Sequence, residues 1–393
     1  MINQRSSPPG LRAGRYQRQL TGYRAFMPAD LPPTPPVAVR GELQAQLSAA
    51  DHALGRLDGA VFTLPNPDLF VLMYVRKEAV LSSQIEGTQS SLQDVLTAEA
   101  AIFDPRRPRD VDEVLNYVHA MNHGLDRLAQ LPVSVRLIRE IHQILMHGVR
   151  GGKLQPGELR TSQNWIGPGG CTLNEATFVP PPPHAVPERL SQLERFVHQQ
   201  DDLPVLLKVG MAHAQFETIH PFLDGNGRTG RLLITFLLTE RKLLSRPVLY
   251  LSHYFKQQRQ TYYERLQAVR DHGDWEGWLG FFLRGVAEVA NEATDTARRI
   301  LSMREDNRNR IAEHLGRAAG NGHRVLESLF RQPVIGVADV RQWLNITPAG
   351  ANSLVARLEK LGILREITGH ARNRRFRFEA YLQLFEGGDE TKA

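Results

Sequence analysis

Residues 220–231, HPFLDGNGRTGR, gather several chemically active side chains into one short segment. His220 titrates near neutral pH and can take a proton from a hydroxyl nucleophile. Asp224 offers a hard carboxylate oxygen to Mg²⁺. Arg228 and Arg231 are three residues apart, so on a helix they share one face and can bind phosphate through bidentate hydrogen bonds. This set suits transfer from a nucleoside triphosphate, in which positioning and charge neutralisation carry most of the chemistry.

The two glycines of this segment suit an anion site. Gly225 and Gly227 let the backbone approach a ligand closely and form a nest of N–H donors. The flanking sequences LLKVGMAHAQFETI and RTGRLLITFLLTE are both typical of helices, so the segment leads into a helix N-terminus, which attracts anions. The alternative is a capped helix with a buried histidine and surface arginines. A lone residue would favour that alternative, whereas the whole set favours a nucleotide site.

Most of the chain around this segment shows the apolar spacing of amphipathic helices, which predicts a mainly α fold. Residues 8–36 are rich in proline and predict an extended arm without a helix. Residues 160–183 interrupt the helical pattern, and TSQNWI, a Gly/Pro turn and ATFVP predict a β-hairpin. No apolar run approaches the ~18 residues of a membrane span.

The C-terminal part predicts a separate basic module. Three short helical patterns, the last beginning at Thr347-Pro348, precede two short strands, ILREIT and RRFRFEA, which together indicate a winged helix-turn-helix. Residues 321–378 hold ten Arg/Lys and four Asp/Glu, and this difference of six equals the net charge of the whole chain, +6. Such a charge favours an anionic partner, nucleic acid first. A solvated basic face or a protein-docking module remains open.

These patterns divide the chain of 393 residues into five parts. They are an N-terminal arm with helices (1–110), a helical core (111–300), a linker helix (301–320), a winged-helix domain (321–386) and a disordered tail (387–393). The single cysteine, Cys171, excludes an internal disulfide framework and a multi-cysteine zinc site. The first residues, MINQRSSPPG, lack the apolar centre of a secretory signal. Both features favour a cytoplasmic protein.

Residues 220–231 resemble the signature of the Fic family, HxFx(D/E)GNGRxxR, with no departure. The resemblance implies a helical core with the signature loop between two helices, and transfer of AMP from ATP to a Ser, Thr or Tyr hydroxyl of a protein. It implies that His220 is the general base, that Asp224 binds Mg²⁺ and that Phe222 anchors the loop. The implied ATP-binding residues of the signature are Asp224, Gly225, Asn226, Gly227, Arg228, Thr229, Gly230 and Arg231. Relatives that transfer other groups often change the glycines, so Gly225 and Gly227 favour adenylylation.

The resemblance extends to the predicted hairpin. Residues 160–183 resemble the family's flap, which aligns a target segment by pairing with it as an extra β-strand. The resemblance implies that the turn of the flap lines the nucleotide and that a tyrosine pair lies near the adenine. The residues concerned are Ile166, Gly167, Pro168, Gly169, Tyr262 and Tyr263. Taken alone, a helical tyrosine pair more often packs in a core, and GPGG more often forms a turn.

A second motif, SSQIEG at 82–87, resembles the inhibitory motif of the family, (S/T)xxxE(G/N). Ser82 and Glu86 are four residues apart and therefore share a helix face, and Gly87 follows directly. The resemblance implies that Glu86 pairs with Arg231, and a guanidinium that already holds a carboxylate cannot also hold the γ-phosphate. The alternative is a helix end with a surface glutamate. In some members this glutamate activates water to remove AMP, and that activity also stays open.

Three functions remain open for the chain. The first is an autoinhibited adenylyltransferase that uses ATP and Mg²⁺ and modifies a protein hydroxyl, including one of its own. The second is a DNA-binding regulator whose Fic core only senses a nucleotide. The third is a Fic enzyme that transfers a different group. The resemblance also implies a homodimer, and no membrane contact is expected.

Overall fold

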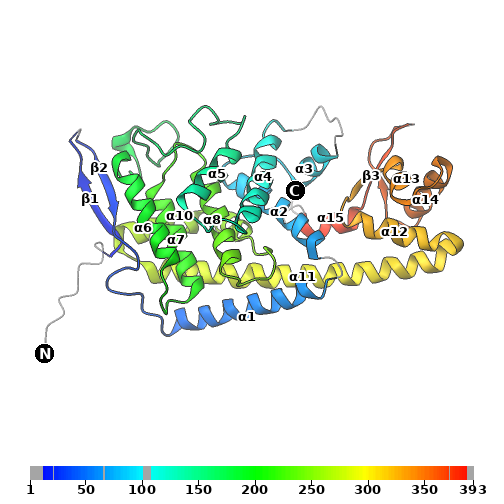
Figure 1. The fold of residues 1–393 in the computed structure, drawn as a ribbon, viewed down its shortest axis with the longest axis horizontal. Coiled ribbons are helices and arrows are strands. Elements are labelled where there is room, and N and C mark those ends of the chain that lie inside the picture. Colours follow the sequence, from blue (N-terminus) through cyan, green and yellow to red (C-terminus); the bar gives the residue numbers. More distant parts are fainter. Residues whose placement is uncertain (1–11, 21, 65–66, 101–107, 371, 387–393) are drawn as a thin grey trace.

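The longest element of the computed structural model is helix α11 (Trp275–Leu315), 41 residues that run along the length of the molecule, with most of the other helices above it (Figure 1). Asp274 caps its start by accepting a hydrogen bond from the Gly277 N–H at 3.0 Å. Helix α1 (Glu42–Phe62) lies alongside it. The predicted boundary at 300/301 falls inside α11, because buried apolar residues continue along this helix as far as Ile311 and Leu315.

The structure describes residues 12–20, 22–64, 67–100, 108–370 and 372–386, so the predicted tail at 387–393 lies outside the described residues. The mainly helical class predicted from the sequence is confirmed. The other helices of the core are α2 (Pro67–Ile85), α3 (Leu92–Glu99), α4 (Val111–Arg127), α5 (Val135–Leu145), α6 (Val186–His198), α7 (Val205–Ile219), α8 (Asn226–Glu240), α9 (Ser252–Gln257) and α10 (Arg259–His272). Among the described residues, no helix is both long and apolar enough to cross a bilayer.

Helices α7 and α8 form the centre of this core. Residues 206–219 of α7 are all buried, including the polar side chains of Lys208 and Gln215. Helix α8 is buried from Arg228 to Leu238. A helix that is covered on every side belongs to the middle of a fold. The loop between α7 and α8 therefore starts and ends on rigid elements.

The N-terminal arm pairs with itself. Strands β1 (Gly14–Arg18) and β2 (Arg24–Pro28) form an antiparallel hairpin where only an extended arm was predicted. The Phe26 N–H donates to the Val179 carbonyl at 2.9 Å, and the Phe26 ring packs on Phe178 at a centroid distance of 5.9 Å. These contacts tie the hairpin to the end of the flap, and the surrounding prolines hid the short alternating pattern.

The flap segment, residues 160–183, contains less strand than predicted. Its two sides meet in one antiparallel bridge, in which Ile166 and Phe178 exchange backbone hydrogen bonds of 2.8 and 3.0 Å. A 3-10 turn, η2 (Leu173–Glu175), occupies part of the connection. The ladder stops after Val179, because the prolines at 180–183 have no N–H to donate.

The C-terminal unit has the connectivity of a winged helix-turn-helix. Its elements are α12 (Ala319–Leu329), β3 (Val334–Gly336), α13 (Val337–Leu344), α14 (Pro348–Lys360), β4 (Arg365–Glu366) and β5 (Arg375–Arg377). The strands form an antiparallel sheet in the order β3-β5-β4. The sequence predicted two of these strands and missed β3, whose three residues are too few to show an alternating pattern. Thr347 caps α14 as predicted, accepting from the Gly350 N–H at 3.2 Å.

A final helix, α15 (Glu379–Glu386), returns to the core and packs on α2. The Phe385 ring lies 5.6 Å from the Tyr74 ring and 6.5 Å from the Phe70 ring. The Arg377 side chain also donates a hydrogen bond of 2.7 Å to Gln93 at the start of α3. The C-terminal unit thus touches the helix that leads into the motif at residues 82–87.

Candidate active site

The loop between α7 and α8 has a strained, well-supported backbone. His220, the residue after α7, is left-handed (φ 48°, ψ 62°), and Gly225 is left-handed directly before α8 (φ 77°). A left-handed non-glycine residue costs about 1–3 kcal/mol and persists only where its surroundings fix it. The Asn226 amide provides such support by binding both the N–H and the carbonyl of Phe222, each at 2.8 Å.

The loop is also anchored from helix α5. The Phe222 ring, which is fully buried, stacks on the His142 ring at 3.7 Å. The Gly157 N–H donates to His142 Nδ1 at 2.8 Å, which leaves His142 Nε2 to donate to the Asp224 carbonyl at 2.9 Å. Burial lowers the pKa of His142 to about 4, so the imidazole stays neutral and keeps this arrangement. The predicted anchor, Phe222, therefore has a histidine partner that no sequence pattern indicated.

A cavity of about 520 Å³ opens above this loop. Ligand pockets commonly have volumes of roughly 300–1,000 Å³, so the space suits a nucleotide. The predicted residues that line it are Glu86, Ile166, Gly167, His220, Gly227, Arg231, Tyr262 and Tyr263. The predicted residues that do not line it are Ser82, Gly87, Pro168, Gly169, Asp224, Gly225, Asn226, Arg228, Thr229 and Gly230. Four separate parts of the sequence thus meet around one space.

The His220 imidazole is held in its neutral form. Burial lowers its pKa to about 3, and the nearby Arg270 and Arg160 guanidinium groups lower it further in the same direction. Arg160 also fixes the residue in place, donating from Nε to the His220 carbonyl at 2.9 Å. A neutral imidazole can accept a proton throughout the physiological pH range.

Arg231 is fully engaged by the motif at residues 82–87. Its guanidinium donates to Ser82 Oγ at 2.8 Å, to the Ser82 carbonyl at 3.0 Å and to Glu86 Oε1 at 2.6 Å. Burial alone would raise the pKa of Glu86, but the charge and hydrogen bond of Arg231, with help from Arg228, hold that pKa below its ordinary value. The Glu86 carboxylate is therefore ionised, and it occupies the cavity face of Arg231.

Gly227 lets this carboxylate come close to the loop. A Cβ atom at position 227 would lie 2.2 Å from Glu86 Oε1 and 3.1 Å from Arg231 Nη1. Contacts below 3.0 Å are essentially never seen for a real Cβ. The carboxylate thus lies against the glycine of the predicted anion nest, at the place where a bound anion is expected.

Arg228 points away from the cavity. Its buried guanidinium donates to Glu113 Oε2 at 3.1 Å and contacts Met146 Sδ at 3.4 Å. Thr229 is similarly occupied within the helix, donating to the Gly225 carbonyl at 2.9 Å. A role of Arg228 in binding phosphate stays a prediction, and in this conformation the side chain connects α8 to α4.

Asp224 is the candidate ligand for Mg²⁺. Its Oδ1 accepts a hydrogen bond of 2.6 Å from the Gly225 N–H, and the side chain is half-buried. Within the described ranges, no group of three or more His, Cys, Asp or Glu residues could hold a metal ion. Mg²⁺ commonly binds one or two carboxylates together with substrate phosphates. The single carboxylate of Asp224 fits this pattern of Mg²⁺ binding only when a nucleotide supplies the other oxygen ligands.

The tyrosine pair divides into one buried and one exposed member. Tyr262 is 1% exposed, hydrogen-bonds His213 Nε2 through its hydroxyl at 2.8 Å and stacks on Phe255 at 4.5 Å. Tyr263 is 42% exposed and presents its ring to the cavity. Tyr262 therefore mainly packs in the core, and Tyr263 is the better placed to contact a base.

Several cavity residues were missed by sequence reasoning. Glu217 lies one turn before His220, with 4.0 Å between Glu217 Oε2 and His220 Nδ1, and burial raises its pKa to about 7. Arg270 lies over the Phe178 ring at 3.9 Å, and Trp165, which is 41% exposed, also lines the cavity. The spacing of three between Glu217 and His220 was the one available signal, because it places both on one helix face.

Comparison with solved structures defines the class of fold. The chain superposes on a Fic family protein from Desulfovibrio desulfuricans G20 with a TM-score of 0.56 and 20% identity, over 87% of this chain and 97% of that one. It also matches a Fic domain containing signaling protein from Bacteroides thetaiotaomicron VPI-5482, with a TM-score of 0.51 and 16% identity, over 64% and 95%. These likenesses show a Fic-type helical fold.

Sequence comparison then gives the family. The model of the Fic/DOC family N-terminal region matches residues 44–126, and that of the Fic/DOC family matches residues 132–238. Residues 44–126 and 132–238 therefore carry the two regions of the Fic/DOC family, and the resemblance found in the signature is confirmed.

Two curated relatives carry a named activity. The chain is 41% identical over 182 residues to a probable protein adenylyltransferase of Aquifex aeolicus (strain VF5), covering 45% of this chain and 51% of that protein. It is 28% identical over 217 residues to the protein adenylyltransferase Fic of Drosophila erecta, covering 54% and 39%. The chain thus spans about half or less of the length of these relatives.

Proposed function

We propose that the protein is an adenylyltransferase that transfers AMP from ATP to a Ser, Thr or Tyr hydroxyl of a protein. The observation that carries this proposal is the cavity of about 520 Å³, where the neutral His220 and the glycine of the loop face Arg231. A base, an anion-binding loop and a cation around one space are the parts that nucleotidyl transfer needs. The two curated relatives bear the name protein adenylyltransferase, which supports the same reaction.

The proposed reaction follows from the positions of these groups. His220 takes the proton of the attacking hydroxyl as its oxygen forms a bond to the α-phosphorus. The bond between the α-phosphorus and the bridging oxygen breaks, and pyrophosphate leaves with the electron pair. Free N–H groups at the start of α8, beside Gly227, stabilise the charge on the phosphate oxygens. Asp224 would hold Mg²⁺, whose positive charge would neutralise part of the phosphate charge.

We propose further that Glu86 keeps this reaction slow. Its carboxylate is 2.6 Å from Arg231 Nη2 and lies against Gly227, so a triphosphate would have to displace it. Displacing Glu86 breaks its ion pair with Arg231. The cost of breaking this pair reduces the net free energy that ATP gains on binding. The resting protein then places the terminal phosphates poorly and turns over slowly.

The location and assembly of the enzyme are also proposals. A single free cysteine, Cys171, suits a reducing cytoplasm. A homodimer is implied by the resemblance to the family, and the oligomeric state can be measured directly by light scattering of the full chain.

Isotope position tests the proposed reaction. The Glu86→Gly variant should become labelled by ATP that carries ³²P in the α-phosphate and should remain unlabelled by ATP that carries it in the γ-phosphate. The Glu86→Gly/His220→Ala variant is the matched control and should take up neither label. Labelling from the γ-phosphate would show a phosphotransferase instead, and equal labelling of the control would remove His220 from the chemistry.

A further inference from the structure

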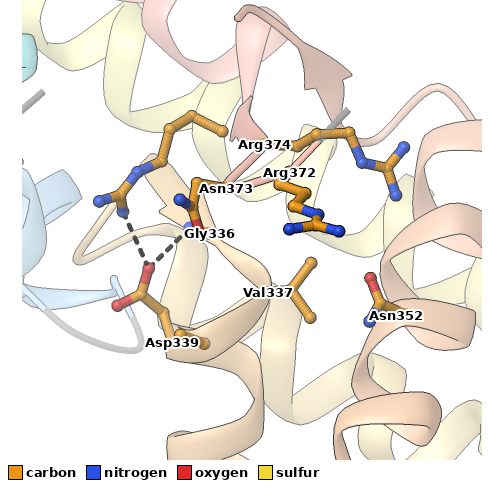
Figure 2. Close-up of a pocket in the computed structure, with 9 residues that line it drawn as sticks. Gly336, Val337, Asp339, Asn352, Arg372, Asn373 and Arg374 are labelled. Atoms are coloured by element: carbon orange, nitrogen blue, oxygen red, sulfur yellow. Dashed lines mark hydrogen bonds and ion pairs between the residues drawn. The ribbon is translucent and has the colours of Figure 1, made fainter. Parts of the chain in front are cut away.

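The C-terminal unit contains a second pocket, far from the cavity above the loop. It has a volume of about 570 Å³ and lies between the start of α13, helix α14 and the turn that precedes β5. Residues 367–370 and 372–374, which lie between β4 and β5, are called the wing from here on. In Figure 2, Arg372 lies above Val337, and Asn352 lies beside Val337 on the right.

The wing carries positive charge that the rest of the unit offsets only in part, through the interaction of Arg374 with Glu366. Among the described residues, neither Arg372 nor Arg374 has an ion pair within 4.0 Å, and Arg372 is exposed. Arg375 differs, since its guanidinium lies 3.6 Å from the Asp339 carboxylate, which also accepts a hydrogen bond of 2.6 Å from the Gly336 N–H. Asp339 is therefore occupied within the unit, and the open side of the pocket is positive.

Helix α14 presents a face that can enter a groove. Apart from Lys360 at its end, the exposed positions of α14 and its N-cap carry short side chains and no acidic residue; they are Thr347, Pro348, Ala349, Asn352, Ser353 and Ala356. Such a surface lets the helix backbone approach another molecule closely. A major groove about 12 Å wide admits an α-helix, and an asparagine amide can pair with both adenine edge atoms there.

The same unit lacks the features of a protein-docking surface. Among the described residues, the exposed large hydrophobic side chains are Leu20, Phe62, Leu154, Trp165 and Tyr263, and none of them belongs to the C-terminal unit. Protein interfaces depend on a few buried aromatic or apolar anchors. A positive wing beside a short-chained helix face fits a polyanion better than a protein.

We propose that α14 and the wing form a binding site for duplex DNA, with α14 in the major groove and Arg372 and Arg374 on the flanking phosphates. Asn352, at the groove side of α14, contacts base edges. Duplex RNA fits less well, because its major groove is too narrow and deep for side chains to read. This site is separate from the cavity that holds His220 and does not depend on the proposed reaction.

The test is the binding of the full chain to a fluorescein-labelled random duplex of about 24 base pairs, followed by anisotropy between about 50 and 200 mM KCl. Binding should weaken steeply with salt, because each phosphate contact releases counterions. The Arg372→Ala/Arg374→Ala variant should lose about two units of the log–log salt slope, about one for each phosphate contact, and about tenfold in affinity. Asn352→Ala should keep the wild-type slope, because an amide neutralises no phosphate.

The matched control is Arg136→Ala/Arg298→Ala, which removes two arginines that are 73% and 68% exposed on other elements. This control should bind DNA as the wild type does, and all variants should keep the wild-type melting temperature. Absence of binding at about 50 mM KCl would overturn the proposal, as would equal losses in the control. Equal affinity for polyglutamate of matched charge would also overturn it and point to an acidic protein partner. Equal affinity for duplex RNA would remove the assignment of α14 to a major groove.

Discussion

Arg231 makes its contacts with Ser82 and Glu86 through the same guanidinium that a nucleotide would need. A guanidinium has five N–H donors in a fixed planar fork, and three hydrogen bonds already orient this fork toward α2. A triphosphate and the Glu86 carboxylate cannot both take the cavity side of the group. The balance between them is therefore set by single residues.

Removing the carboxylate should release the enzyme. Glu86→Gly should raise self-adenylylation by at least about tenfold, which corresponds to about 1.4 kcal/mol. Glu86→Gln, which keeps the shape and loses the charge, should give a smaller increase. Arg231→Ala should lower the activity of the Glu86→Gly background. The rates can be followed by label incorporation from α-labelled ATP, and equal rates in wild type and Glu86→Gly would contradict the proposed brake.

The pH profile should reflect the buried state of His220. Its pKa is lowered to about 3, so the imidazole remains deprotonated as the pH falls from 8 to 5. For a base, activity is lost only as the pH falls through its pKa, and kcat/KM reports the free enzyme. In the Glu86→Gly variant, kcat/KM should show no acid limb near pH 6.5. An acid limb near pH 6.5 in this variant would contradict the prediction. It would mean that His220 titrates as an exposed histidine does.

The sequence predicted which residues form the loop better than it predicted where their side chains point. The types and spacing in residues 220–231 indicated an anion site, and four predicted segments do meet at one cavity. The direction of Arg228 was hidden, because its partner Glu113 is 115 positions away and on another helix. The partners of Tyr262 were hidden for the same reason, since His213 and Phe255 come from two other helices.

At the scale of elements, α2 is the helix that positions the brake. Glu78 and Ser82 are four residues apart and lie along one face of α2, and Glu86 directly follows its last residue, Ile85. Glu78 is buried and accepts a hydrogen bond from the Tyr117 hydroxyl at 3.0 Å and one from the Ser252 hydroxyl. These contacts connect α2 to α4 and α9, which holds Ser82 and Glu86 in register with Arg231.

Glu78 should make stability depend on pH. Burial raises its pKa from 4.5 to about 7, so the folded state binds more protons than the unfolded state between these values. The free energy of unfolding should therefore fall as the pH rises from 4.5 to 7, by about 3 kcal/mol from this group. Glu78→Gln removes the titratable group. The melting temperature of this variant relative to that of wild type should therefore rise as the pH goes from 5 to 8. Parallel pH curves for the two proteins would contradict this.

Helices were easier to predict than the short strands. Apolar spacing along α4, α5 and α11 is local information, and the sequence shows it directly. The flap and the β1–β2 hairpin instead depend on each other, through the contacts of Phe26 with Phe178 and Val179. Pairing between distant segments leaves no periodic trace, so these elements were predicted with the wrong extent.

At the scale of the whole molecule, α15 links the C-terminal unit to the brake. Helix α15 lies beside α2 (Figure 1). Tyr381 and Phe385 are buried, and the Phe385 ring contacts Phe70 and Tyr74 on α2. No local pattern in the sequence indicated this docking, because an apolar helix face does not show which element it packs against. A molecule that binds the C-terminal unit would therefore act close to α2, the helix that ends directly before Glu86.

Loosening this contact should weaken the brake. Phe385→Ala removes a large buried ring, a change that typically costs 3–5 kcal/mol in a packed core. The variant should adenylylate itself about two- to tenfold faster than wild type, and it should add nothing in the Glu86→Gly background. Ile335→Ala is the control, since Ile335 is buried within the C-terminal sheet away from α2. Equal rates for Phe385→Ala and wild type would limit α15 to a structural role.

The most direct test of the central claim is intact-mass analysis of wild type, Glu86→Gly and His220→Ala after incubation with ATP and Mg²⁺. The account predicts an adduct with the mass of AMP that is strong in Glu86→Gly, weak in wild type and absent in His220→Ala. Absence of the adduct from all three proteins, with cell lysate present as a source of targets, would contradict it and favour a nucleotide sensor built on an inactive core.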